Sequence, residues 1–445
     1  MTCRSEKILQ CTLYGALTGI VVGSVGALFQ LCIHWLLHER NLAIQQLTTH
    51  LPLQCLLAIF FATLLMGLSL FIVRIVAGAS GSGVQEIQGT LAGKSKMRWQ
   101  RILPAKFIGC VLSLSSGLVL GREGPTIQMG GAIGQLIKTV FHLDKEQRHI
   151  LIAAGAGAGL ATTFNAPLAG IIFVIEGMRH QFRFSFKAFH TVVIACVIAD
   201  ISLQLIIQIS HVNLSQMMAI NMATYQTMPL SSLWLFVIFG IILGLIGTLF
   251  NTYLVKSLNF FSRRNGFNFW KWIVLIGIIT GILMVTFPAV IGGGYAVIPA
   301  ALHGNMSLNM LLTLLILRFF TSVISYGTGV PGGIFAPMLA LGSIAGMLFG
   351  SIAQIFFPHL IPHPQVFAVA GMSALFTATV GAPLTAVVLL VKMTMNYDLI
   401  LPLILTCFSA AISAMLMKAR PIYVVLLSRT LVLEHKRTLY LKTKT

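Results

Sequence analysis

Acidic residues are scarce in this chain. Its 445 residues include only 10 Asp and Glu against 29 Lys and Arg, charged residues make up 9% of the whole, and 57% are hydrophobic. Soluble globular domains carry about a quarter of their residues as charged ones, so this class is excluded. The apolar runs are long and show no alternation of apolar and polar residues, which argues against a transmembrane β-barrel. The composition therefore predicts a polytopic α-helical membrane protein.

Paired cysteines are also missing. Seven cysteines are scattered singly, mostly within apolar runs, and none forms a CxxC pair. Because neither a disulfide framework nor a zinc site has the spacing it needs, we expect free thiols and no bound metal. A cleavable signal peptide is not evident, since the first apolar run, Leu13 to Leu37, is long enough to stay in the bilayer.

The net charge of +19 comes from basic residues in separate clusters, so no folded patch for nucleic acid is expected. The positive-inside rule places such clusters, and with them both termini, in the cytoplasm. The connections 45–54, 211–232 and 358–365 contain no Lys or Arg and should lie on the opposite side. The clusters are Lys94, Lys96, Arg98, Arg101 and Lys106; Arg179, Arg183 and Lys187; Lys256, Arg263, Arg264 and Lys271; and the basic residues from Lys418 to Lys444.

Two formal charges stand inside an apolar region at Gly121-Arg122-Glu123-Gly124-Pro125. An intramembrane carboxylate is by default a candidate for an ion or proton path, because ionising it in hydrocarbon costs at least about 2.5 kcal/mol. Gly121 and Gly124 let the backbone turn tightly, and Pro125 suits the first position of a helix. The free amides and positive dipole at such a helix start make Arg122 and Gly124 candidate anion ligands beside Glu123.

The second half of the chain repeats the plan of the first. Segments rich in glycine or proline interrupt the apolar runs of both halves at matching positions, which indicates a transporter-type repeat with its binding site at the midplane. The matched segments are Gly81-Ser82-Gly83 with Gly292-Gly293-Gly294, Gly121 to Pro125 with Gly329 to Pro337, Ala154-Gly155 with Ala370-Gly371, and Ala166-Pro167-Leu168 with Ala382-Pro383-Leu384.

This repeat defines the expected organisation of the chain. We expect a first membrane repeat over residues 1–210, a non-cytoplasmic connection over 211–232, and a second membrane repeat over 233–424. A short basic cytoplasmic tail would follow over 425–445. The small residues from Ala153 to Ala161 superficially resemble a dinucleotide loop, but no strand precedes them, and close helix packing explains them better.

Three motifs, taken in their order and spacing, resemble the CLC family of chloride channels and chloride/proton exchangers, the bacterial exchangers most closely. They are Gly81-Ser82-Gly83-Val84, Gly121-Arg122-Glu123-Gly124-Pro125 and Gly332-Gly333-Ile334-Phe335-Ala336-Pro337. The resemblance runs through Tyr423 and implies an all-α fold of two inverted-topology repeats with broken and re-entrant helices. It also implies a homodimer with one ion pathway per subunit, in the lipid bilayer of a bacterial inner (plasma) membrane. Chloride and protons would be the transported ions, with no cofactor.

The resemblance further implies roles for single residues. The hydroxyls of Ser82 and Tyr423 and the amides of Ile334 and Phe335 would hold a central anion. Glu123 would be the gate that competes with chloride and carries the proton. In the family, a proline at the position of Ser82 goes with a preference for nitrate.

Three positions depart from the family pattern: Gln85 replaces a common proline, Lys392 replaces a common glutamate, and Gly177 replaces a glutamate that relays protons from the cytoplasm. Gly177 would leave space for water. Glu176 beside it is a candidate for the internal end of the proton route, or else a solvated carboxylate at a helix end near Arg179. Two functions therefore stay open. Proton-coupled exchange is favoured because the pathway residues match exchangers, and a passive voltage-gated-type chloride channel is the alternative.

A remote alternative is an intramembrane serine protease, because Gly78-Ala79-Ser80-Gly81 satisfies the GxSG pattern of rhomboids. That chemistry needs a histidine base on a neighbouring span, and His190 is the least implausible of the histidines. A protease would not require duplicated helix starts. We therefore expect a transporter and not an enzyme.

Overall fold

The computed structural model describes residues 2–46, 50–179, 181, 185–210, 212, 228–264, 266–304 and 306–442. Within these ranges the chain is helical, and its only β-type pairing is two isolated bridges. Eight of the described helices are long and apolar enough to cross a membrane. The chain is thus an all-α multi-pass membrane protein, as predicted. Most of the predicted connection 211–232 lies outside the described residues, as do Arg183 and residues 443–445.

The first half contains long spans and shorter broken helices, and local chemistry sets several of their ends. A capping box starts the sixth helix: the Asp144 carboxylate accepts from the Gln147 amide at 2.7 Å, and the Gln147 side chain accepts from the Asp144 amide at 3.2 Å. The helices are α1 (Thr2–Gln46), α2 (Leu51–Ile75), α3 (Val84–Leu91), α4 (Trp99–Ser115), α5 (Glu123–Val140), α6 (Lys145–Phe164), α7 (Pro167–Gly177) and α8 (Phe186–Ile209).

The second half follows the same plan, with breaks at the predicted segments. Proline starts α16 as it starts α7, because a missing N–H costs nothing in the first turn. The helices are α10 (Leu233–Ser262), α11 (Gly266–Thr286), α12 (Val297–Leu302), α13 (Leu308–Gly327), α14 (Phe335–Phe356), α15 (Gln365–Val380), α16 (Pro383–Thr394), α17 (Ile400–Leu416) and α18 (Ile422–Lys442). The predicted tail is therefore largely helical, since α18 runs through it.

Equivalent helix pairs pack closely in the two halves, α5 on α6 and α14 on α15. A Cβ on Gly155 would collide with the backbone of Gly130, and a Cβ on Gly371 would collide with the backbone of Gly342. Glycine thus brings the paired backbones together. The prediction that the small residues of α6 serve helix packing is confirmed.

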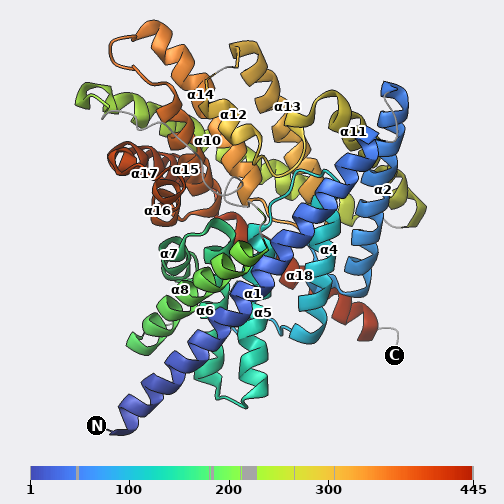
Figure 1. Ribbon diagram of the computed structural model, residues 1–445, viewed down its shortest axis with the longest axis vertical. Coiled ribbons are helices and arrows are strands. Elements are labelled where there is room, and N and C mark those ends of the chain that lie inside the picture. Colours follow the sequence, from blue (N-terminus) through green and yellow to red (C-terminus); the bar gives the residue numbers. More distant parts are fainter. Residues whose placement is uncertain are drawn as a thin grey trace.

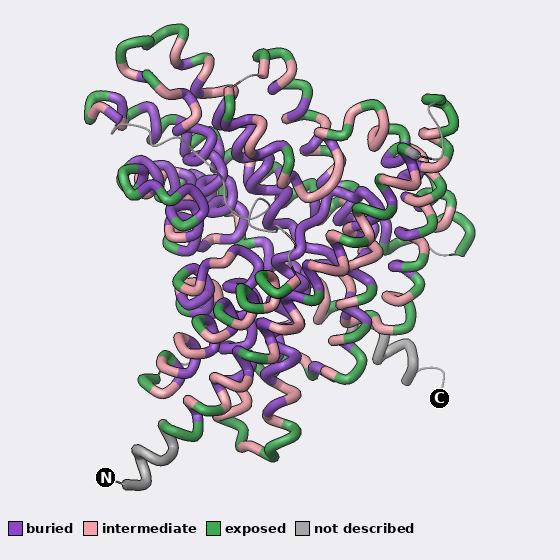
Figure 2. Tube along the Cα trace, in the orientation of Figure 1, coloured by how far each residue is buried: buried purple, intermediate pink, exposed green. Residues whose placement is uncertain are grey.

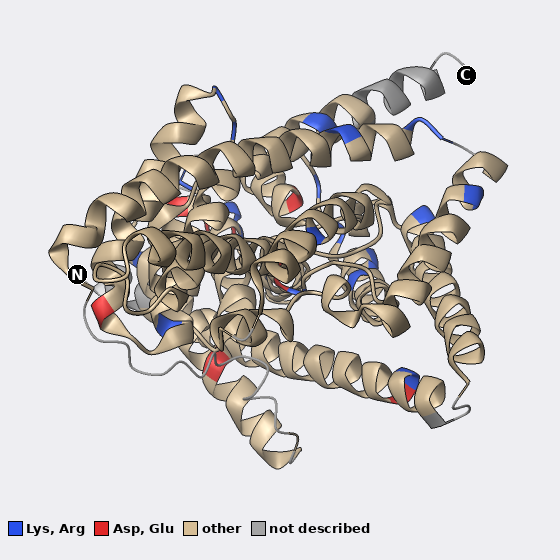
Figure 3. Cartoon of the chain, turned by 90° about the horizontal axis from the view of Figure 1, so that it is seen from above, with Lys and Arg blue, Asp and Glu red and all other residues tan. Residues whose placement is uncertain are grey.

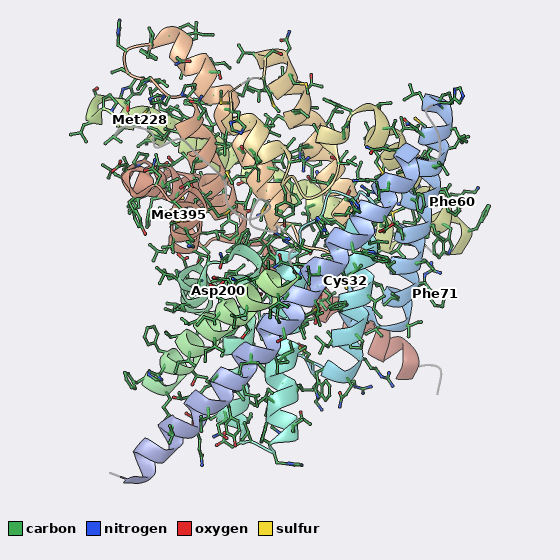
Figure 4. The ribbon with its side chains drawn as sticks, viewed as in Figure 1. Cys32, Phe60, Phe71, Asp200, Met228 and Met395 are labelled. Atoms are coloured by element: carbon green, nitrogen blue, oxygen red, sulfur yellow. The ribbon has the colours of Figure 1, made fainter. Side chains whose placement is uncertain are left out.

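Burial and charge follow the membrane setting. Buried residues gather where the two halves meet (Figure 2), and charged residues are sparse among the helices (Figure 3). Phe60 and Phe71 of α2 are 58% and 59% exposed and point away from the molecule (Figure 4), as side chains that face lipid do.

The loops separate into two ends. The end of α1, the start of α2 and the connection between α14 and α15 lie at the top of Figure 1, whereas the loops after α3 and α5 lie at the bottom. The basic loop 94–98 and the uncharged connections 45–54 and 358–365 are therefore at opposite ends, which agrees with their predicted separation across a membrane.

Candidate functional site

Four loops meet at the centre of the molecule, where helices of both halves are interrupted. Their backbones are joined by hydrogen bonds, which satisfies the peptide groups that broken helices leave open at membrane depth. Gly81 donates to Val330 at 3.2 Å and accepts from Gly332 at 3.0 Å, Gly121 and Gly333 exchange two bonds of 2.8 and 2.6 Å, and Gly292 donates to Gly117 at 3.0 Å. The breaks of one half thus support those of the other.

Helices start at these loops, as predicted: α3 at Val84, α5 at Glu123 and α14 at Phe335. One detail was wrong. Pro125 is the third residue of α5, not the first. This position costs nothing either, because none of the first amides of a helix has an intrahelical partner.

Glu123 is fully buried at the start of α5. Its carboxylate accepts a hydrogen bond from the Tyr295 hydroxyl and a second, at 3.4 Å, from the Ala336 amide in the first turn of α14. Arg122 points elsewhere: its guanidinium donates to the Gln30 side chain at 3.2 Å and lies 4.6 Å from the centre of the Tyr295 ring. The carboxylate is thus held by neutral donors, which could hold a chloride ion equally well.

Ser82 and Tyr423 lie next to each other beside this carboxylate, 0% and 2% exposed. The two hydroxyls face each other, and neither forms a hydrogen bond with any other described residue. Buried hydroxyl groups without a partner are rare, and two together indicate a place built for a ligand. A Cβ on Gly124 would collide with Ser82 Oγ, so the first turn of α5 closes directly onto this hydroxyl.

Ile334 and Phe335, the other predicted anion ligands, are buried at the start of α14. The Phe335 ring stacks on Tyr423 at 6.0 Å and contacts Phe173 of α7 at 6.1 Å and Phe376 at 4.8 Å between ring centres. The structure therefore gathers Ser82, Glu123, Gly124, Ile334, Phe335 and Tyr423 around one centre, with an aromatic cluster between it and α7. Their individual roles stay predictions.

Glu176 has a position that sequence reasoning missed. Its carboxylate accepts from the Leu384 amide at 3.0 Å and from the Thr385 amide and hydroxyl, both at 2.8 Å. Glu176 thus caps α16 across the boundary between the repeats, where a negative charge also suits the helix dipole. Lys392, the equivalent residue of α16, is exposed.

The space expected at Gly177 is partly filled. A Cβ there would lie 3.0 Å from the Phe173 ring, and the Gly177 carbonyl already accepts from the Gln88 side chain at 2.9 Å. The glycine is therefore part of a packed contact between α3 and α7.

The first basic cluster was wrongly assigned to a loop as a whole, because Arg101 and Lys106 lie inside α4. Lys106 is fully buried and donates to the carbonyls of Ala79 and Gly81 at 3.0 and 2.6 Å. Its ammonium group therefore supports the loop that carries Ser82. The signal was its distance from the other basic residues, since Ile102 to Ala105 separate it from Arg101.

Two tyrosines at the centre were also missed. Tyr295 contacts Glu123, and the Tyr326 hydroxyl accepts from the Ser82 amide at 3.3 Å. Tyr295 could have been found, because it directly follows the glycine segment Gly292 to Gly294 that the repeat matches to the Ser82 loop.

The structure contradicts the protease alternative. Ser80 Oγ donates to the Gly329 carbonyl at 2.8 Å, and His190 lies 3.3 Å from the Thr12 hydroxyl. Serine and histidine thus have separate partners in separate contacts, so the nucleophile and base that this chemistry requires are not paired.

A cavity of about 520 Å³ approaches Glu123 from the end of the molecule that carries connection 45–54. We call it the outer vestibule. Its lining includes Gln30, Arg40, Arg122, Gly293 and Tyr295. Arginine side chains in its wall would attract anions toward the centre.

Comparisons with known proteins give consistent results. The family described as voltage gated chloride channel matches residues 62–414. A protein named H(+)/Cl(-) exchange transporter ClcA from Vibrio parahaemolyticus is 42% identical, covering 96% of this chain and 91% of its own. One of the same name from Salmonella paratyphi A is 41% identical, covering 96% and 90%.

Two solved structures are similar as well. A slow cyanobacterial Cl-/H+ antiporter is 40% identical and aligns with a TM-score of 0.89 over 95% of this chain and 98% of its own. A eukaryotic CLC transporter, 23% identical, aligns with a TM-score of 0.79 over 95% and 74%, and supports the fold alone.

Proposed function

This chain belongs to the voltage gated chloride channel family, and we propose that it exchanges chloride for protons, with Glu123 as gate and proton carrier. One observation carries the proposal: a fully buried carboxylate is held by neutral donors beside the hydroxyls of Ser82 and Tyr423, which have no partner among the other described residues. Relatives of about 40% identity that are named exchange transporters add support.

Competition between two anions links the two fluxes. When ionised, Glu123 occupies the position between Tyr295 and the Ala336 amide and excludes chloride from it. Protonated Glu123 is uncharged and forms weaker hydrogen bonds with these donors, so chloride can replace it. Since each release of the carboxylate takes up a proton, anion movement and proton movement alternate at one residue.

The experiment is reconstitution of the purified chain into liposomes, with chloride and pH recorded together. Under opposed gradients an exchanger uses the chloride gradient to drive protons uphill in the opposite direction, and its reversal potential depends on both ions. A reversal potential fixed by chloride alone at every pH would contradict exchange and leave the passive chloride channel.

The proposal includes the setting implied by the family resemblance. The protein would be a homodimer with one pathway per subunit, in a bacterial inner (plasma) membrane, with both termini cytoplasmic. Chloride and protons would be its substrates, and it would need no cofactor. The exposed apolar residues on α8, α10 and α17 supply surfaces for lipid and for a second subunit. Light scattering of the detergent-solubilised protein tests the subunit number.

Ser82→Pro is expected to raise nitrate flux relative to chloride flux in liposomes. Proline removes the hydroxyl, a neutral donor that suits chloride, and also the amide that donates to Tyr326. Ser82→Ala removes the hydroxyl alone and is the matched control. An unchanged nitrate-to-chloride ratio in both variants would remove Ser82 from the anion site.

Gly177→Glu is expected to strengthen proton coupling, because it restores a titratable group at the position that lacks one. The cost is local, since the new Cβ would lie 3.0 Å from the Phe173 ring, which must shift. The measurement is the proton-to-chloride ratio in liposomes across pH. Gly177→Gln has the same bulk and cannot titrate, so equal coupling in both variants would exclude a proton relay at this position.

A further inference from the structure

Tyr295 is the side-chain donor to the gate carboxylate, beside the backbone amide of Ala336. Its hydroxyl donates to Glu123 Oε1, and its ring is stacked under the Arg122 guanidinium, which Gln30 holds in turn. Tyr295, Arg122 and Gln30 all line the outer vestibule. Tyr295 therefore stands between the vestibule and the carboxylate.

The loop before Tyr295 is built like the loop that carries Ser82. In the first repeat, Gly81 and Gly83 have positive φ angles of 59° and 88°, and in the second, Gly292 and Gly294 have 66° and 98°. Only glycine adopts this conformation readily, so both loops need glycine at the same two positions. One loop places the Ser82 hydroxyl against α5, and the other leads directly into Tyr295.

The second loop is also held firmly. Arg318 is fully buried in α13 and donates to the carbonyls of Ala289 at 2.6 Å, Ile291 at 3.2 Å and Gly292 at 2.9 Å. A side chain on a loop held in this way is already in position, so it loses little conformational entropy when it binds the carboxylate. Tyr295 is thus fixed before the carboxylate meets it.

We propose that Tyr295 is a positioning residue that latches the gate: its hydroxyl holds ionised Glu123 in the anion position, against chloride arriving from the outer vestibule. The proposal rests on the function of Glu123 proposed above. A hydrogen bond to an ionised group is stronger than one between neutral groups, so the Tyr295 hydroxyl stabilises the ionised carboxylate where it already stands. Chloride must break this bond before it can enter, which weakens its binding and slows exchange.

The test is a cycle of two substitutions, Tyr295→Phe and Glu123→Ala, in the full-length protein. Chloride binding is measured by calorimetry in detergent, and turnover in liposomes. Tyr295→Phe keeps the ring under Arg122 and removes only the hydroxyl. We expect it to tighten chloride binding by about tenfold, the factor that a hydrogen bond to a charged group represents. Turnover is expected to rise with it.

The double variant shows whether Tyr295 acts through the Glu123 carboxylate or only supports the structure around it. When Glu123→Ala has removed the carboxylate, Tyr295→Phe should change chloride affinity no further, because nothing remains to be latched. Tyr253→Phe removes the hydroxyl of a tyrosine that is 44% exposed on α10; it is the matched control and should leave affinity unchanged.

Each other result has a definite meaning. Unchanged affinity in Tyr295→Phe alone, or an equal change in both backgrounds, would overturn the latch. If Glu123→Ala by itself left chloride binding unaltered, the gate assignment would fall, and the fault would lie with the proposed function.

Discussion

Glu123→Ala is expected to lose proton movement linked to chloride while it continues to conduct chloride. Alanine can neither carry a proton nor occupy the donors that hold the carboxylate. Removal of a proton-transfer group costs roughly 100-fold or more, so uphill proton flux should fall to the background of empty liposomes. Glu123→Gln, which keeps the size of the side chain without its charge, should behave in the same way.

Simultaneous recording of chloride efflux and internal pH measures this effect. Glu146→Gln is a suitable control, because Glu146 is an exposed carboxylate at the start of α6, far along the chain from the central loops. Normal proton pumping by Glu123→Gln against a chloride gradient would show that another group carries the proton.

The fold was largely predictable because its signals are local. Runs of apolar residues gave the spans, and glycine and proline gave the breaks at Gly81, Gly121, Pro167 and Pro383. The repeat then supplied the tertiary arrangement, since equivalent breaks must be buried together if their peptide groups are to find partners. Helix boundaries within the first turn were less certain, as Pro125 shows.

The centre was predictable only in part, because its remaining contacts join distant segments. Lys106 looks like the end of a basic loop until the carbonyls of Ala79 and Gly81 are placed around it. Glu176 looks like a solvated or proton-carrying group until α16 of the other repeat begins beside it. Tyr295 follows a recognised glycine segment, yet only the packing of α12 on α14 and of α14 on α5 brings its hydroxyl to Glu123. The sequence shows the chemistry of each of these side chains, but it does not show which distant residues they contact.

The same central contacts make the site intolerant of added volume. Four loops from two repeats share one small region, and their backbones approach within hydrogen-bond distance of one another. A close approach of this kind is possible only where a side chain is absent. The glycines of the motifs are therefore expected to matter through the atoms that lie against them, and Gly124 lies against the hydroxyl proposed to bind chloride.

Gly124→Ala is expected to reduce chloride binding and both fluxes by roughly 10- to 100-fold, the effect of about 1–3 kcal/mol of overpacking. The new Cβ would overlap Ser82 Oγ and would lie 3.0 Å from both the Cβ and the carbonyl oxygen of Ser82. Gly67→Ala is the matched control, since the nearest atom to its Cβ is 3.8 Å away on Trp270. Alanine also suits the interior of α2 better than glycine does.

The cause can be separated from a general loss of folding. Ser82→Gly removes the hydroxyl and the Cβ that the new methyl group would meet, so Gly124→Ala combined with Ser82→Gly should recover part of the chloride flux lost in Gly124→Ala. Gly124→Ala and the double variant should elute alike in size-exclusion chromatography and unfold at the same temperature. Transport by Gly124→Ala at the unaltered rate would mean that α5 does not close onto Ser82 during exchange. Equal loss in the single and double variants would place the damage in the backbone of the motif, because the side chain of Ser82 would then have no part in it.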